Sequence, residues 1–209
     1  MKVTWLGQSG FLFENSKLKI MVDPYFSDAL GEKYPEKKRR FDVPTEYFDI
    51  NPDVILVTHE HVDHLDMKTL GKILENSDKA VTFLCSESAY KKAVTLGGNH
   101  NYVLLSPHSV WSISGVTFYS VRAEHTDRTA VGFIIDDVLD LAPDGVDYAF
   151  LPINGRGNNM NARDAADFAY EIGAKCAIPT HYGLVDDITP EEFDFDDRLI
   201  LEPFKEVKI

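Results

Sequence analysis

The sequence predicts an α/β fold in which short strands outnumber helices. Two observations predict it: short apolar runs bounded by Gly, Asn, Ser or Pro recur along the whole chain, and only a few longer segments are suited to helices. Hydrophobic residues make up 44% of the 209 residues, which is enough for a substantial core. No shift in composition marks a linker, so we expect one domain spanning residues 1–209.

The first part of the chain is expected to be strand-rich. Turn residues such as Gly7-Gln8-Ser9-Gly10 separate its apolar runs. A later segment, residues 31–45, carries a basic cluster with little periodicity, which we interpret as a solvated surface loop rather than a lip that recruits anions. The strands expected here are residues 3–6, 11–13, 18–22 and 54–58.

Three helices are expected in the remaining chain. Asp66 can cap a helix over residues 67–76, and Asn161 can cap another over 162–172, which Gly173 would end. A third helix is expected over residues 86–96. The strands expected between and after these helices are residues 80–85, 102–105, 110–113, 116–121, 130–135, 148–151 and 176–178.

Net charge and apolar run length restrict the partners and the compartment. A formal net charge of −13 repels phosphate backbones and anionic lipid, so we expect no nucleic acid and no membrane as partner. No apolar run approaches a membrane span and no signal peptide is evident, which predicts a soluble, cytoplasmic protein. Cys85 and Cys176 lie in or beside apolar strands, so both are predicted to be buried thiols rather than a disulfide.

Ligand-type residues crowd directly after the apolar run at residues 54–57. His59, His61, Asp63 and His64 fall within six positions there. A buried strand delivers the residues that follow it to a sheet edge, and imidazoles with a carboxylate at such an edge make a transition-metal site. His59 and His61 are two apart on an extended segment and can hold one ion, whereas Asp63 and His64 would face a second.

Further ligands must come from other segments. His125 and His181 each lie just past a predicted strand, as His59 does. Either one alone is more often a surface or core histidine, and the cluster makes both candidate ligands. His100, His108 and Cys176 are not assigned to the site. The expected cofactor is one or two divalent ions, Zn or Mn, since histidine and aspartate suit both metals.

Residues 59–64 match HxHxDH, which is the signature of the metallo-β-lactamase superfamily. Through this motif the chain resembles that superfamily. Within it, the chain is similar to the branch containing L-ascorbate-6-phosphate lactonase and related metal-dependent hydrolases. The stretches that carry this similarity are residues 5–11, 22–28, 126–133, 151–156, 159–161 and 178–183.

The resemblance implies a four-layer αβ/βα sandwich with the metals at one edge, a small-molecule substrate and assembly into a homo-oligomer. Asp23 would support the ligand loop from behind. Gln8 stands where many superfamily members carry a histidine and is not called a ligand. By position, the first ion would be held by His59, His61 and His125, and the second by Asp63, His64 and His181.

One element of that family is missing after residues 130–135. The family has a strand there ending in Gly-Asp-Thr or Gly-Asp-Ser, whose aspartate bridges the two ions, and no such motif follows here. Three explanations compete. The segment is truly absent, another aspartate (Asp136, Asp137 or Asp140) replaces the bridging residue, or some residues are missing from the sequence as given. Omission would leave far more than about 3.8 Å between neighbouring Cα atoms somewhere between Asp136 and Leu139.

These features predict a hydrolase that cleaves a lactone or ester of a small, optionally phosphorylated substrate with metal-activated hydroxide. Asp63 and His64 are the candidate catalytic residues. Arg156 is a candidate clamp for a phosphate or carboxylate, or else a surface arginine. Tyr182 is a candidate donor to the leaving group, or else a core residue. The alternatives are a phosphodiesterase of the same superfamily and a non-catalytic or impaired metal-binding relative that lacks the bridging aspartate.

Overall fold

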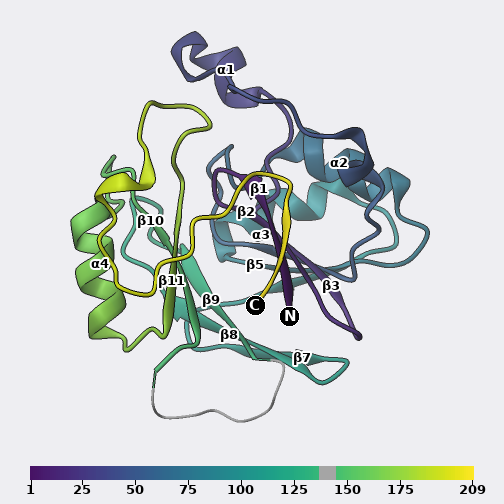
Figure 1. Cartoon of the computed structure of the whole chain (residues 1–209). Helices are drawn as coiled ribbons and strands as arrows, with labels where there is room; N and C mark the ends of the chain where they lie inside the picture. The colour runs from purple at the N-terminus through teal and green to yellow at the C-terminus, as the bar shows by residue number, and fades with distance from the viewer. Residues whose placement is uncertain (137–144) are drawn as a thin grey trace.

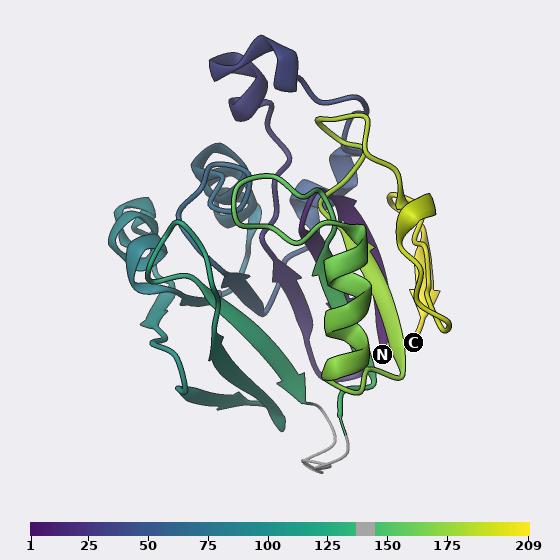
Figure 2. The ribbon, with the colours of Figure 1, turned by 90° about the vertical axis from the view of Figure 1, so that its left-hand side faces the viewer.

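Two β-layers packed face to face form the centre of the protein, with helices on both outer sides (Figure 1, Figure 2). The computed structural model describes residues 1–136 and 145–209. The first layer is a seven-stranded mixed sheet in the order β12-β1-β2-β3-β4-β5-β6. Its strands are β1 (Lys2–Gly7), β2 (Gly10–Glu14), β3 (Lys19–Val22), β4 (Val54–Val57), β5 (Thr82–Cys85), β6 (Asn101–Leu104) and β12 (Glu206–Lys208).

The second layer consists of two smaller sheets. One is an antiparallel sheet in the order β7-β8-β9, and the other is the parallel pair β10-β11. The expected αβ/βα sandwich is therefore present. The strands of this layer are β7 (Val110–Ile113), β8 (Val116–Arg122), β9 (Val131–Asp136), β10 (Tyr148–Pro152) and β11 (Cys176–Thr180).

The central strand β4 shows why its sequence is a continuous apolar run. All four of its residues are fully buried. Successive side chains of a strand point to opposite faces, and both faces of this sheet are covered. Val54 and Leu56 pack into the core between the two layers, whereas Ile55 and Val57 pack into the cluster beneath the helices. This double burial holds the start of the ligand loop rigidly in place.

Helices close both sides of the sandwich. On one side, α2 (Met67–Asn76) and α3 (Glu87–Ala93) bury their apolar faces with the first sheet. On the other, α4 (Ala162–Glu171) lies along β10 and β11 (Figure 2). The predicted caps are present: Asp66 accepts the Lys68 and Thr69 N–H groups, and Asn161 accepts that of Asp164. Within residues 1–136 and 145–209, every helix is too short or too polar to cross a membrane.

The segment at residues 31–45 departs from the expected loop. It contains the end of α1 (Ala29–Lys33), the 3-10 turn Pro35–Lys37 and the start of another, Thr45–Asp49. Its basic cluster is not wholly solvated, because the Arg39 guanidinium donates to the Tyr25 and Phe41 carbonyl oxygens. Arg39 therefore ties the segment that follows α1 to Tyr25, which precedes the helix. Two other 3-10 turns are Val94–Leu96, which ends the expected third helix, and Pro190–Glu192.

Candidate metal centre

The ligand loop at residues 58–66 begins where β4 ends, beside the end of β3. The Asp23 N–H donates to the Leu56 carbonyl oxygen at 2.9 Å, which continues the parallel pairing of the two strands. The N–H and hydroxyl of Thr58 both bond the Asp23 side chain. Asp23 therefore lies directly under the start of the ligand loop.

Two other chain segments are fastened to the same edge by backbone hydrogen bonds. The Val131 N–H donates to the Thr58 carbonyl oxygen at 3.1 Å and brings in the loop before β9, which carries His125. The His181 N–H donates to the Gln8 carbonyl oxygen at 3.0 Å and joins the end of β11 to the β1–β2 turn. Both layers of the sandwich thus contribute side chains to one site.

All six residues predicted to bind metal come together at this edge. They form two groups, and within each group the candidate ligand atoms lie within 4.8 Å of one another. The groups adjoin, since the ring centroids of His59 and His64 are 3.9 Å apart. The first group is His59, His61 and His125, and the second is Asp63, His64 and His181.

In the first group the three imidazole rings lie close together at steep angles to one another. The His59 centroid lies 4.7 Å from that of His61 and 4.1 Å from that of His125. His59 Nε2 is buried and has no hydrogen-bond partner within the part of the chain that the structure describes. His125 Nδ1 accepts the Asp127 N–H at 3.1 Å, so a neutral His125 ring carries its hydrogen on Nε2.

One carboxylate oxygen links the second group. Asp63 Oδ2 accepts the Gln8 side-chain amide at 3.0 Å, and it lies 3.4 Å from His181 Nε2 and 3.9 Å from His64 Nε2. Asp63 is thus held between two imidazoles. Gln8, which is not called a ligand on sequence grounds, lies against two residues of this group, Asp63 and His181.

Asp23 supports the site from behind, as the resemblance implies. Its Oδ2 atom lies 2.7 Å from His64 Nδ1 and accepts the Thr58 hydroxyl at 2.6 Å, and its Oδ1 atom accepts the Thr58 N–H at 2.8 Å. Asp23 is only 1% exposed. Sequence reasoning missed Thr58; the available signal was a hydroxyl directly before the first histidine of the cluster.

Asn154 is a second residue that sequence reasoning missed. Its amide nitrogen lies 2.8 Å from His181 Nδ1, and its amide oxygen accepts the Arg156 N–H at 3.4 Å and the Asn159 side chain at 2.9 Å. The backbone donor at Arg156 fixes which end of the Asn154 amide faces His181. The Gly/Asn-rich loop after β10 is therefore attached to the second group.

Three residues at this edge have a left-handed backbone. Gln8, Asp23 and His181 have φ values of 53°, 40° and 61°. Such conformations are costly for residues other than glycine and persist only where the surrounding structure enforces them. Their concentration around the second group indicates a site whose side-chain directions are maintained against local backbone preference.

The pKa values of four site residues are shifted differently in the two groups. Burial, reinforced by His64 and His125, lowers the pKa of His59, so its ring stays neutral. Burial also lowers the pKa of His125. Burial opposes ionisation of Asp63, but His64 and the bonds from His181 and Gln8 outweigh it and hold the Asp63 pKa well below its usual range. Burial likewise opposes the charged form of His64, yet Asp23 and Asp63 raise the His64 pKa.

The two candidate substrate residues lie in different surroundings. Arg156 is exposed at the tip of the loop after β10. Tyr182 is 7% exposed and packs on Trp5 with ring centroids 5.0 Å apart. Burial raises the pKa of Tyr182 to about 12. These contacts match the core-packing alternative for Tyr182, whereas Arg156 remains available to a ligand.

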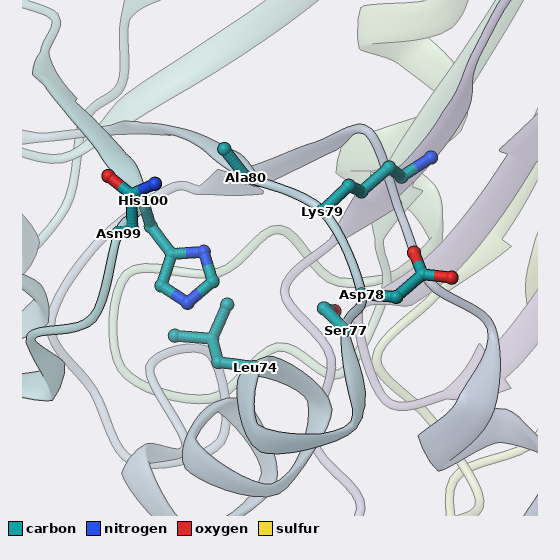
Figure 3. Close-up of a pocket in the computed structure, with 7 residues that line it drawn as sticks. All are labelled: Leu74, Ser77, Asp78, Lys79, Ala80, Asn99 and His100. Carbon is teal, nitrogen blue, oxygen red and sulfur yellow. The ribbon is translucent and has the colours of Figure 1, made fainter.

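The other histidines and the cysteines belong to neither group. His100 accepts the Val81 N–H at the start of β5 and lines a hollow there (Figure 3), whereas the metal edge lies at the end of that strand. His108 lies in the turn before β7. Both cysteines are free thiols. Cys85 is buried, and Cys176 is partly buried at the opposite end of β11 from His181.

The aspartates proposed to replace the bridging residue do not fill that place where the structure describes them. Asp136 pairs with Thr117 at one end of the β8–β9 hairpin, whereas Val131, at the other end, adjoins the ligand loop. A six-residue strand separates its ends by roughly 17 Å. Asp136 therefore lies away from both groups. Asp137 and Asp140 lie outside the described residues. The Cα–Cα spacings between Asp136 and Leu139, which would reveal omitted residues, also involve residues outside the described ranges.

Comparison with known proteins gives a family. Residues 2–181 match the beta-lactamase superfamily domain. A UPF0173 metal-dependent hydrolase of Pyrococcus furiosus is 30% identical over 215 aligned positions, which cover 92% of this chain and 90% of that protein. These positions outnumber the 209 residues of the chain, so the relative contains residues with no counterpart here.

Two further similarities concern the fold and one local stretch. A metallo hydrolase from Ignicoccus hospitalis superposes with a TM-score of 0.76 at 20% identity, covering 99% of this chain and 97% of that one. The mitochondrial N-acyl-phosphatidylethanolamine-hydrolyzing phospholipase D of Saccharomyces cerevisiae is 44% identical over 68 residues, which are 32% of this chain and 14% of that protein. None of these matches singles out the ascorbate-6-phosphate lactonase branch.

Proposed function

Since the chain belongs to the beta-lactamase superfamily domain family and to the UPF0173 metal-dependent hydrolases, we propose that it is a metal-dependent hydrolase that cleaves a lactone or ester of a small substrate. One observation carries the proposal: two adjoining groups of ligand-type side chains, drawn from both layers of the sandwich, converge at one sheet edge. Structural needs alone do not account for five histidines and a carboxylate at one place.

The residues fit a divalent metal. His59 Nε2 is a buried nitrogen for which the described residues supply no partner, and such an atom is costly to bury unless something binds it. Neutral imidazoles with one carboxylate are the donors that Zn²⁺ and Mn²⁺ accept. The first group would hold one ion through His59, His61 and His125. The second would hold another through Asp63, His64 and His181.

A bound divalent ion supplies water activation near neutral pH and polarisation of the scissile carbonyl. The protein's own groups then have distinct tasks. Asp63, whose pKa is held low, stays ionised at neutral pH and can orient the attacking water and take its proton. His64, fixed by Asp23, keeps its ring directed into the second group.

The position of Arg156 suggests which substrates the site prefers. The guanidinium is exposed on a loop that Asn154 ties to His181. A guanidinium binds a phosphate or carboxylate through two parallel hydrogen bonds. We therefore propose that the preferred substrate carries an anionic group at a distance from its lactone or ester bond. Tyr182 then shapes the site through packing rather than by donating a proton.

Chelation with a substrate panel tests the function. Purified protein is treated with a chelator, dialysed, and reloaded with Zn²⁺ or Mn²⁺, and turnover of lactones, carboxylic esters and phosphodiesters is measured at each stage. We expect turnover of a lactone or ester that the chelator abolishes and one of the metals restores. Turnover that resists chelation would contradict the proposal.

A phosphodiesterase is the second candidate, and the local match to a phospholipase D favours it. The same metal ions activate water for attack at phosphorus as well as at a carbonyl. The net charge of −13 disfavours a nucleic-acid substrate, so a small phosphodiester or a lipid headgroup would be the target. In the panel, phosphodiester turnover without lactone turnover would select this candidate.

A further inference from the structure

We propose that Thr58 is a positioning residue that sets which nitrogen of His59 carries the proton, and that through Thr58 the single carboxylate of Asp23 orients one imidazole in each group. The inference rests on the proposed metal centre for its consequence, which is metal affinity. The hydrogen bonds themselves join groups of the chain alone, and they can be measured whether or not hydrolysis is found.

The direction of the relay follows from counting donors and acceptors. A carboxylate only accepts hydrogen bonds, and a threonine hydroxyl has one hydrogen to donate. The Thr58 hydroxyl lies 2.6 Å from Asp23 Oδ2, so its hydrogen goes to Asp23. His59 Nδ1 lies 2.9 Å from the same hydroxyl oxygen. His59 must therefore supply the hydrogen of that bond from Nδ1, which leaves the lone pair on Nε2.

The same carboxylate fixes a histidine of the second group directly. His64 Nδ1 lies 2.7 Å from Asp23 Oδ2, so it donates to Asp23, and the neutral form of the ring then has its lone pair on Nε2. His59 and His64 belong to different groups. One buried carboxylate thus prepares a metal-binding nitrogen in each group, directly for His64 and through the Thr58 hydroxyl for His59.

Two of the other three histidines of the site, His125 and His181, show that this preparation is selective. His125 Nδ1 accepts a backbone N–H, and His181 Nδ1 faces the amide nitrogen of Asn154. A neutral ring at either position therefore carries its hydrogen on Nε2. Metal binding through Nε2 of either ring would release a proton, whereas a neutral His59 or His64 with its hydrogen on Nδ1 needs no such change.

Burial makes the relay dependent on Thr58. Asp23, His59 and His64 are 1%, 5% and 7% exposed, so water has little access to replace a lost bond. Without the Thr58 hydroxyl, a hydrogen on His59 Nδ1 would be buried with no acceptor, which is costly. Moving the hydrogen to Nε2 relieves this cost but removes the metal-binding lone pair.

The test reads the imidazole tautomers by nitrogen–proton correlation NMR on the chelator-treated full chain. In the wild type we expect hydrogen on Nδ1 of both His59 and His64. Thr58→Val, which keeps the shape and removes the hydroxyl, should shift His59 towards the Nε2–H tautomer and leave His64 unchanged. Thr58→Ser should behave as the wild type. Thr117→Val changes a buried threonine whose hydroxyl meets Ser112, and it controls for loss of a threonine hydroxyl away from the site.

A second readout is metal affinity by competition with a chelator. Changes to residues that hold metal ligands from behind lower affinity about 10- to 100-fold, and we expect that loss for Thr58→Val but not for Thr58→Ser or Thr117→Val. A wild-type His59 with hydrogen on Nε2 would overturn the inference even if Thr58→Val failed to fold. An unchanged His59 tautomer in folded Thr58→Val would do the same. If the tautomers are as expected and no substrate is turned over, the hydrolase proposal fails and the relay stands.

Discussion

His64 Nδ1 and Asp23 Oδ2 lie 2.7 Å apart although the two residues are 41 positions apart in the sequence. The contact joins the loop after β4 to the end of β3, two neighbouring parallel strands. Parallel strands end at the same edge, so the residues that follow them can meet without any long connection. The register of β3 with β4 thus decides whether the second group is oriented.

Asp23→Asn tests this relationship. Asparagine tolerates the left-handed backbone that Asp23 adopts at φ 40°, so the backbone should persist while the charge is lost. We expect metal affinity to fall about 10- to 100-fold. We also expect the free energy of unfolding to fall by about 1–3 kcal/mol, because hydrogen bonds to a charged acceptor are lost. Chelator competition and urea denaturation measure the two effects.

Asp194→Asn is the matched control for this charge change. The Asp194 side chain is 98% exposed and forms an ion pair with Arg198, four positions along the chain. Exposed ion pairs contribute little to stability. Metal affinity and unfolding should therefore match the wild type. Equal losses in Asp23→Asn and Asp194→Asn would mean that net charge, and not the His64 contact, controls the site.

Removing one ligand from each group should separate the two ions. We expect two ions in the wild type, and one in each of His59→Ala and His181→Ala, because the candidate ligands of the groups are distinct. Elemental analysis of dialysed protein gives the counts, and His100→Ala, a change at the far end of β5, should keep both ions. A wild type that binds no ion would support the non-catalytic alternative instead.

The fold was predictable where sequence patterns are strongest. The run at residues 54–57 predicts a buried strand because both faces of β4 are covered. Asp66 and Asn161 act as the caps that their side chains favour. Short elements escaped prediction: β12 has three residues, two of them charged, and exists because it pairs with β1. Tertiary pairing, not local preference, makes such a strand.

The clustered candidate ligands were predictable from the sequence, whereas two residues that hold the ligands in place, Thr58 and Asn154, were not. Four of the candidate ligands can be recognised because they lie within six positions of the sequence: His59, His61, Asp63 and His64. Thr58 and Asn154 carry ordinary polar side chains, and their importance comes from what the fold places beside them. Nothing in a sequence reveals that an amide of one loop meets an imidazole of another strand. Thr58 and Asn154 therefore needed the structure, whereas the resemblance implied the supporting role of Asp23.

Arg156→Ala should weaken binding of anionic substrates. Loss of hydrogen bonds to a charged group costs about 1.5–3 kcal/mol, which corresponds to a rise in KM of roughly ten- to a hundred-fold. Arg156→Lys should recover part of this loss, because it keeps the charge but not the paired geometry. Arg163→Ala, an exposed arginine at the start of α4, is the control. An equal KM increase for an uncharged substrate would contradict the clamp.

The two thiols should differ in reactivity. Burial raises the pKa of Cys85 to about 12, so about one in ten thousand of its side chains is thiolate at pH 8. Burial and Asp197 also raise the pKa of Cys176, which is more exposed. In native protein we expect slow labelling of Cys176 by a thiol reagent and none of Cys85. Both thiols should react after unfolding. In Cys176→Ala the slow labelling of native protein should disappear, and only the labelling of Cys85 after unfolding should remain.

The raised pKa of Cys85 also predicts a pH effect on stability. An unfolded cysteine has a pKa of about 8.5, whereas that of folded Cys85 is about 12. Between these values the folded state binds more protons than the unfolded state, so the contribution of Cys85 to stability is complete below about pH 8.5 and falls as the pH rises. Urea unfolding across this range should show a shallower loss of stability in Cys85→Ala than in the wild type. Parallel pH curves for the two proteins would show that Cys85 does not carry this dependence.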